Sequence, residues 1–262
     1  MSTDSNLRTH QQAEKALHRV QGYFLRTQHR DGYWWGELES NPTMEAEYIM
    51  LTYWLASDEG DRIPKVAQDI KRRQLPNGSW PMYYNGPGDL STTIECYFAL
   101  KLAGESTTEP QMVRAKEFVL KNGGIANSRI FTKIWLALFG QWDWTGTPVM
   151  VPELILLPSW APFNIYKFAS WARATLVPLL IILADHPTRS PSIEFALDDL
   201  YVQAKSQTNT SLPRRGQGLL SAERLFLMAD KLLRWYEKVP WKPFRRLAIK
   251  KAERWIIAHQ EA

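Results

Sequence analysis

Cysteine is nearly absent from this chain: Cys96 is the only one in 262 residues. A disulfide framework and a metal site built on cysteines are therefore excluded. The five histidines are scattered, without the short spacing that metal ligands on one element show. We expect no bound metal.

Long apolar runs are missing as well. The longest, Thr175–Ala184, has ten residues, too few to cross a bilayer as a helix. The first fifteen residues are polar and lack the pattern of a signal peptide. We therefore expect a cytoplasmic protein that is peripheral to a membrane at most.

Strand signals are also almost absent, whereas helical periodicity runs through most of the chain. With 45% hydrophobic residues, a chain of 262 can bury a substantial core. Thr92–Glu95 has the pattern of a capping box, and Asp198 and Asp199 are expected on an ordinary helix. The periodicity predicts helices over 8–29, 43–56, 62–74, 92–104, 110–121, 128–140, 165–184, 191–206, 219–238 and 244–259.

A seven-residue turn motif, Gln-x-x-x-Gly-x-Trp, occurs twice, with its first residue at 28 and then 46 residues later at 74. The glycine can take a positive φ just past a helix end, and the glutamine amide can bond to backbone groups left unpaired there. The tryptophan offers a flat face and one N–H donor. Paired helices at such a period predict a solenoid or an α/α barrel. The repeat residues are Gln28, Gly32, Trp34, Gln74, Gly78 and Trp80.

The positive charge is concentrated near the C-terminus. Residues 213–254 hold 12 Lys and Arg against four Asp and Glu, a local charge of +8 in a chain of net charge +5. Within that segment, residues 219–238 form an amphipathic helical wheel. The helix is either a core helix with a solvated polar face or an interfacial helix lying on a membrane. In the second case the lipid-facing residues are Leu225, Phe226, Leu232, Leu233 and Trp235.

The two repeats occur together with several further motifs: GYWWG at 32–36, MEAEY at 44–48, DLSTTIE at 89–95, FTKIWLALFG at 131–140 and SWARA at 170–174. In this order they resemble the N-terminal part of squalene-hopene cyclases, from about residue 12 onward. The resemblance implies two α/α barrels that enclose a cavity and sit on one membrane leaflet. Residues 1–36 would be a helix that packs on the catalytic barrel, and 37–262 most of the other, incomplete barrel, with 219–238 facing the membrane.

The same resemblance implies a reaction without a cofactor. In the family, an aspartic acid of an Asp-x-Asp-Asp motif protonates a terminal alkene, and aromatic rings stabilise the carbocation. This sequence has no Asp-x-Asp-Asp, so we expect no catalytic acid in this chain and no cyclisation by the chain alone. The partners implied are squalene or a similar polyprene, a membrane surface, a C-terminal catalytic barrel in the same or another chain, and a possible second copy of this chain.

Five residues can be carried over from the family pattern. Trp171 matches a tryptophan that lines the cavity, and Glu47 matches a glutamate that affects activity. Glu95 and Arg129 are expected to form a buried charge network with a structural role, because unpaired burial of such groups is costly. Trp135 is expected to serve in packing.

Two other classes of function remain open. The chain could be a non-catalytic lipid-binding scaffold that keeps the fold and the membrane helix. It could also be an α/α-barrel carbohydrate enzyme with a glutamate pair as acid and base. Glu45 and Glu47 diverge on a helix, whereas Glu47 with Glu95 is possible by spacing. Nucleic-acid binding is not expected, because the apolar half of 219–238 would have no use there.

Overall fold

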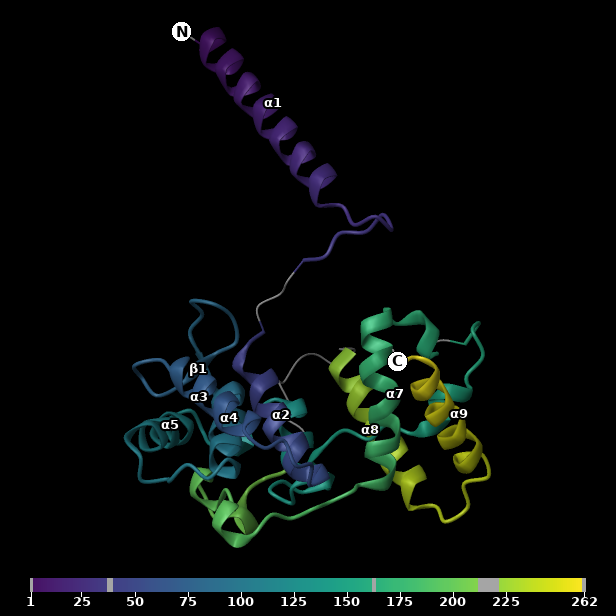
Figure 1. Ribbon diagram of the computed structural model, residues 1–262. Helices are drawn as coiled ribbons and strands as arrows, with labels where there is room; N and C mark the ends of the chain where they lie inside the picture. The colour runs from purple at the N-terminus through teal and green to yellow at the C-terminus, as the bar shows by residue number, and fades with distance from the viewer. Residues whose placement is uncertain (1, 37–39, 162–163, 212–221, 261–262) are drawn as a thin grey trace. The chain divides into compact units, whose positions relative to one another are not determined.

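The computed structural model describes residues 2–36, 40–161, 164–211 and 222–260, with side-chain positions from residue 8 in the first range and from 227 in the last. The chain separates into two compact units, Met1–Ser40 and Asn41–Ala262. The first unit consists of helix α1 (Ser2–Thr27) and the first repeat turn (Figure 1). Several large apolar side chains of α1 are exposed: Leu17, Val20, Tyr23, Phe24 and Leu25.

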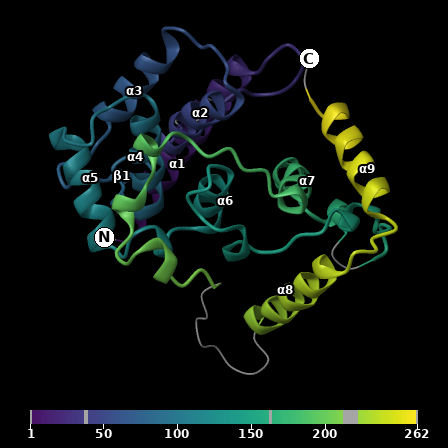
Figure 2. The same ribbon diagram turned by 90° about the horizontal axis from the view of Figure 1, so that it is seen from below.

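One core of the second unit is built from five helices: α2 (Pro42–Leu55), α3 (Arg62–Arg72), α4 (Leu90–Leu102), α5 (Pro110–Lys121) and α6 (Ile130–Leu138) (Figures 1 and 2). Helix α4 is the central one, because its residues from Ser91 to Leu102 are all buried and it packs on α2, α3, α5 and α6. The two-residue strands β1 (Trp80–Pro81) and β2 (Gly88–Asp89) pair antiparallel just before it.

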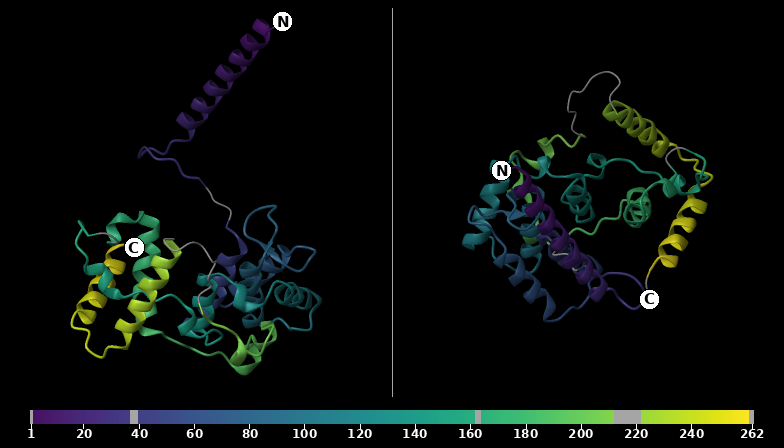
Figure 3. Two further views of the ribbon diagram at one scale, coloured as in Figure 1. Left: turned by 180° about the vertical axis from the view of Figure 1, so that it is seen from behind. Right: turned by 90° about the horizontal axis from the view of Figure 1, so that it is seen from above.

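A second, smaller core joins α7 (Ser170–Asp185), α9 (Arg245–Ala258) and the 3-10 helix η3 (Pro152–Leu156). Its buried side chains include Ile155, Val177, Leu180 and Ala252. Helix α8 (Ala222–Lys238) precedes α9 in the chain, and the two are the light-green and yellow helices of Figure 3. Further 3-10 helices are η1 (Ile125–Asn127), η2 (Trp144–Gly146) and η4 (Ile165–Lys167).

The prediction of an all-α fold is confirmed. The start of α2 is also as expected: Asn41 Oδ1 accepts the N–H of Thr43 at 3.0 Å, and Pro42 occupies the first turn, where its missing N–H costs nothing. No helix in the described part of the chain has both the length and the apolar character needed to cross a bilayer.

The predicted helix over 191–206 is wrong. Three short 3-10 helices stand there instead: η5 (Ile193–Phe195), η6 (Asp198–Leu200) and η7 (Lys205–Gln207). The segment is held by tertiary bonds in place of a helical ladder: Tyr97 donates to Asp199 Oδ2 at 2.6 Å, and the N–H of Leu197 bonds to Gln141 Oε1 at 2.8 Å. Asp199 is therefore a structural acceptor in a short turn and is not on an ordinary helix.

The predicted capping box at Thr92–Glu95 is also wrong. Asp89 is the N-cap of α4, and its Oδ1 accepts the backbone N–H of Thr92 at 2.8 Å. The helix therefore starts before Thr92, which leaves Glu95 inside the helix on a buried face.

Candidate functional site

The two repeat turns make the same hydrogen bonds. In the second, Gln74 Nε2 donates to the carbonyl of Gly78 at 2.9 Å, and the Trp80 indole N–H donates to the carbonyl of Ile70 at 2.7 Å. In the first, the corresponding bonds run from Gln28 to Gly32 at 2.9 Å and from Trp34 to Phe24 at 2.7 Å. Gly32 and Gly78 have φ of 87° and 84°. In each turn, the motif therefore bonds both to itself and to the last turn of the helix that precedes it.

The second turn also bonds to another helix. Gln74 Nε2 donates to the carbonyl of Gln111 in the first turn of α5 at 2.9 Å. A Cβ on Gly78 would lie 2.5 Å from the backbone carbonyl of Arg114, whereas one on Gly32 would meet nothing within 4 Å. Trp80 is fully buried, and Trp34 is 48% exposed. The second turn thus ties the end of α3 to the start of α5.

Four predicted residues come together beside α4. Glu47 lies on α2, Glu95 on α4, and Arg129 and Trp135 lie at the start and in the middle of α6. Burial raises the pKa of Glu47, and a hydrogen bond from the Trp135 indole together with the charge of Arg129 opposes that rise. Trp135 therefore has a polar role in addition to the packing role expected from the sequence.

Glu95 is the most deeply buried carboxyl of this cluster, with 3% of its surface exposed. Burial raises its pKa to about 7, a hydrogen bond from Thr132 opposes the rise, and the charge of Glu47 adds to it. The Thr132 hydroxyl donates to Glu95 Oε1, while Oε2 has no hydrogen-bond partner among the described residues. Near neutral pH this carboxyl is therefore divided between its acid and its ionised form.

Arg129 braces the cluster against the start of α4. Its Nη2 lies 3.3 Å from Asp89 Oδ1, and its backbone N–H donates to Ser91 Oγ at 2.8 Å. Sequence reasoning missed Asp89 and Thr132. The Asp before the STT run of α4 is a signal for the first, since Asp is a preferred N-cap. No local signal identifies Thr132, which lies 37 residues from its partner.

Trp171 is not part of this cluster. It lies in the first turn of α7, whose core is formed with α9 and η3, and 77% of its surface is exposed. Three more exposed aromatic side chains occur shortly before it in the chain: Trp160, Tyr166 and Phe168. Exposed aromatic side chains therefore occur both before α7 and in its first turn.

Helix α8 turns charged side chains toward the protein. Asp230 is buried and accepts the N–H of Val149 at 3.0 Å. Arg234 donates to Asp230 Oδ2 at 2.6 Å and to the carbonyls of Thr145 and Thr147 at 3.0 and 2.7 Å. The charged groups of the helix thus satisfy the irregular backbone at 145–149.

A second ion-pair group fixes the end of α8. Arg245 Nε lies 2.9 Å from Glu153 Oε1, and the Arg245 guanidinium also pairs with Glu237. Lys242 Nζ lies 3.1 Å from Glu237 Oε2. Burial by itself would raise the pKa of Glu237, but Arg245 and Lys242 together lower it.

Large apolar side chains of α8 and of the loop after it point to solvent. We call Met228, Leu232, Trp235, Trp241 and Phe244, all exposed, the α8 patch. Leu232 and Trp235 are 64% and 65% exposed, and with Met228 they share one helical stripe. Of the other residues predicted to face lipid, Leu233 is half-buried. The side chains of Leu225 and Phe226, and residues 219–221 of the predicted helix, lie outside the described part.

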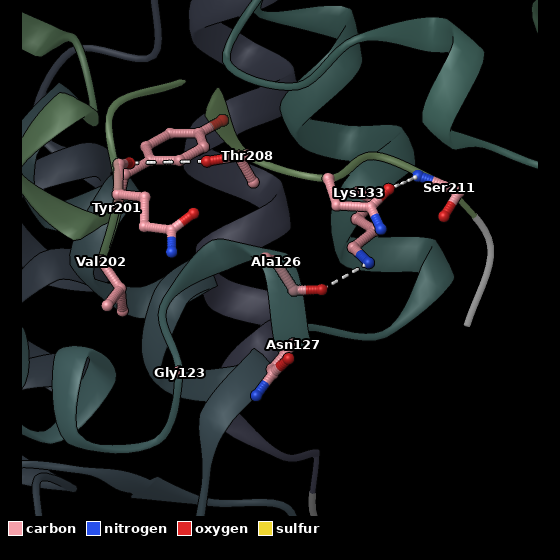
Figure 4. A pocket seen from close by; sticks show the side chains of 10 residues that line it. Gly123, Ala126, Asn127, Lys133, Tyr201, Val202, Thr208 and Ser211 are labelled. Carbon is pink, nitrogen blue, oxygen red and sulfur yellow. Dashed lines mark hydrogen bonds between the residues drawn. The ribbon is translucent and has the colours of Figure 1, made fainter. Parts of the chain in front are cut away.

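A pocket of about 670 Å³ is lined by Lys133 of α6 and by residues between 123 and 127 and between 201 and 211, and none of the predicted site residues lines it. Its charged group is Lys133, whose Nζ donates to the carbonyl of Ala126 at 2.7 Å (Figure 4). The same Nζ stands 4.7 Å from the centre of the Trp142 ring. Burial lowers the pKa of Lys133. Within the described ranges, no group of three His, Cys, Asp or Glu side chains is placed to hold a metal ion.

Comparison with known proteins agrees with this architecture. The chain is 35% identical to a dammaradiene synthase of Dryopteris crassirhizoma, over 95% of this chain and 36% of that protein. It is 39% identical to a squalene–hopene cyclase of Alicyclobacillus acidocaldarius, over 94% of this chain and 38% of the relative. For a squalene–hopene cyclase of Zymomonas mobilis, the identity is 38% over 90% of this chain and 35% of the relative.

The chain thus spans between 35% and 38% of the length of these relatives. The family model for the squalene-hopene cyclase N-terminal domain matches residues 17–262. That range includes all of the second unit and, from the first, residues 17–27 of α1 with the repeat turn that follows. The chain belongs to the family of squalene-hopene cyclase N-terminal domains.

Proposed function

We propose that this chain forms part of the cavity wall and the membrane face of a triterpene cyclase that polycyclises squalene or a similar polyprene without a cofactor. The observation that carries the proposal is the family match over residues 17–262, with relatives named as squalene–hopene cyclases at 38% and 39% identity. The packing of Glu47, Glu95, Arg129 and Trp135 between apolar helices supports it, because burial of the Glu95 carboxyl is costly and has to be offset by specific partners.

In such a reaction, an acid protonates an alkene and a carbocation then travels along the folded substrate. Alkenes are weak bases, so the acid must stay protonated in a dry site until it acts. An exposed aromatic ring on the cavity side can stabilise the cation through its π face. We assign this role to Trp171, and a positioning role to Glu47 with its partner Trp135.

The acid itself is proposed to come from a C-terminal catalytic barrel, in the same chain or in a separate one. No Asp-x-Asp-Asp motif occurs in these 262 residues. The exposed side chains of Phe24 and Trp34 in residues 1–36 are proposed to pack on that barrel, where they would lose their contact with water. The chain alone would then bind polyprene without cyclising it.

A chimera tests the cyclase assignment. This chain would replace the matched segment of the Alicyclobacillus relative, and cyclised products of squalene would be measured by gas chromatography. We expect product from the chimera, and a loss of roughly 10-fold or more with Trp171→Ala because a cation–π contact is removed from the dry site. The matched control is Tyr84→Ala, which removes an aromatic side chain that is also 77% exposed, from the loop between β1 and β2. A soluble chimera that gives no cyclised product would contradict the assignment. Equal losses of product with the two substitutions would contradict it as well.

The α8 patch is proposed as the membrane contact. Three charged residues of helix α8, Asp230, Arg234 and Glu237, are engaged in internal ion pairs. The apolar stripe faces out, which suits an interfacial helix. We expect Leu232→Glu to reduce co-sedimentation of the chain with lipid vesicles by roughly 10-fold, since a charge would have to enter the acyl boundary. Ile193→Glu, at another apolar and exposed position, on η5, is the matched control and should bind as the wild type does. Equal binding by the two folded variants would remove the membrane contact from α8.

The same patch favours one alternative, a non-catalytic lipid-binding scaffold. The chimera separates the two functions. A scaffold would bind vesicles through α8 but would give no product in the chimera, and Trp171 would have no effect on any readout.

A further inference from the structure

The charged side chains of α8 differ in whether they face the protein or the solvent. Between residues 227 and 238, where side chains are described, both carboxylates of the helix, Asp230 and Glu237, are held in internal ion pairs. Arg234 is paired in the same way. Lys231 and Lys238 are exposed, and no ion pair is found for either within the described residues. Among residues 227–238, the exposed charged side chains are therefore both lysines.

The two lysines flank the apolar stripe. At 100° per residue, Lys231 and Lys238 lie about 60 to 80° from Met228 on the helical wheel, next to the stripe that Met228 forms with Leu232 and Trp235. Long lysine side chains at such positions can keep their ammonium groups at headgroup level while the stripe is buried. Cations and apolar groups therefore face the same surface.

The chain after α8 also carries a net positive charge. The exposed charged residues of 244–258 are four cations and one anion, namely Arg246, Lys250, Lys251, Arg254 and Glu253. A neutral lipid surface offers these cations no counter-charge, whereas an anionic one does. A nucleic acid would also attract them, but it would leave the apolar stripe of α8 in water.

We propose that the α8 patch docks on membranes that carry anionic headgroups, with Lys231 and Lys238 as the headgroup contacts. This inference rests on the membrane contact proposed above and specifies the class of lipid. Anionic headgroups supply the attraction at a distance, and burial of the stripe supplies the short-range part. The binding should weaken with salt, because the Debye length is about 10 Å at 0.1 M and shortens as salt is added.

The test is co-sedimentation of the 262-residue chain with vesicles of phosphatidylcholine alone and of an equal mixture of phosphatidylcholine and phosphatidylglycerol. We expect tighter binding to the mixture, and a loss of roughly 10- to 30-fold with the double variant Lys231→Gln/Lys238→Gln, since each cation near an anionic surface contributes a few-fold. The matched control is Lys65→Gln/Lys121→Gln, which removes the same charge from exposed positions on α3 and α5. It should bind more than the α8 variant does. Circular dichroism verifies that both variants are folded.

Other outcomes would overturn the proposal in distinguishable ways. Equal binding to both kinds of vesicle, unchanged by the α8 lysine variant, would refute the headgroup preference and leave the membrane contact standing. No binding of the folded chain to either vesicle would refute both. A dimer in solution that is lost with Trp235→Ser, without vesicle binding, would assign the patch to a second copy of the chain.

Discussion

At the scale of single residues, the unusual group is Glu95, a carboxyl with almost no contact with water and one oxygen without a hydrogen-bond partner among the described residues. Two neighbours have opposite effects on the pKa of Glu95: the charge of Arg129 favours the ionised form, and the charge of Glu47 disfavours it. Motif matching alone selected Glu95, and the helical pattern could not show how deep it lies. Its hydrogen-bond donor, Thr132, comes from a helix that meets α4 only in the folded chain.

Glu95 should make the protein less stable as pH rises. Its pKa is raised from 4.5 to about 7 in the folded state, so the folded protein binds more protons than the unfolded chain between these values. The free energy of unfolding therefore falls as pH increases through this window. In Glu95→Gln that fall should disappear, a relative gain of about 3 kcal/mol at pH 8 compared with pH 5.

Urea denaturation of both proteins at several pH values measures this difference. Glu117→Gln, on an exposed part of α5, is the matched control and should follow the wild-type profile. A variant profile that runs parallel to the wild type from pH 5 to 8 would show that Glu95 is not the group responsible.

At the scale of elements, the repeat turns show what the sequence can predict. Their bonds are local: each glutamine reaches the glycine four residues later, and each indole reaches a carbonyl ten residues earlier. Such a turn is specified by its own residues, so the pattern predicted it. The segment 191–206 has no local specification of this kind. Gln141 accepts the backbone N–H of Leu197, and Tyr97 donates to the carboxylate of Asp199, so distant elements hold the segment and the helical period there was misleading.

The two glycines of the repeats should differ sharply in their response to substitution. Gly78→Ala introduces strain at a positive φ and also forces a Cβ against the backbone of Arg114, so we expect a loss of stability of about 3 kcal/mol. Gly32→Ala introduces only the strain, and we expect a loss of about 1 kcal/mol, confined to the end of α1.

Urea denaturation measures the first loss, and hydrogen exchange of α1 measures the second. Because both glycines have nearly the same φ, each serves as the control for the other. Equal losses would mean that the contact between the second turn and α5 does not stabilise the protein.

At the scale of the whole molecule, the described residues form two hydrophobic cores and leave the α8 patch exposed, while no Asp-x-Asp-Asp motif occurs in the sequence. The all-α architecture followed from the helical period, but the orientation of α8 did not. The wheel placed charges on one side and apolar groups on the other, which fits either a core helix or a membrane helix. Only their bonds to residues 145–149 show that Asp230 and Arg234 face the protein. The closure of the helices into a barrel stays a prediction.

The most direct test is to incubate the purified, folded 262-residue chain with squalene in detergent and to analyse the extract by gas chromatography with mass detection. We predict unchanged squalene and no cyclised triterpene, because the proton donor is assigned to other polypeptide. Hopene or any other cyclised product from the chain alone would show that its own residues protonate the alkene, and would contradict that assignment.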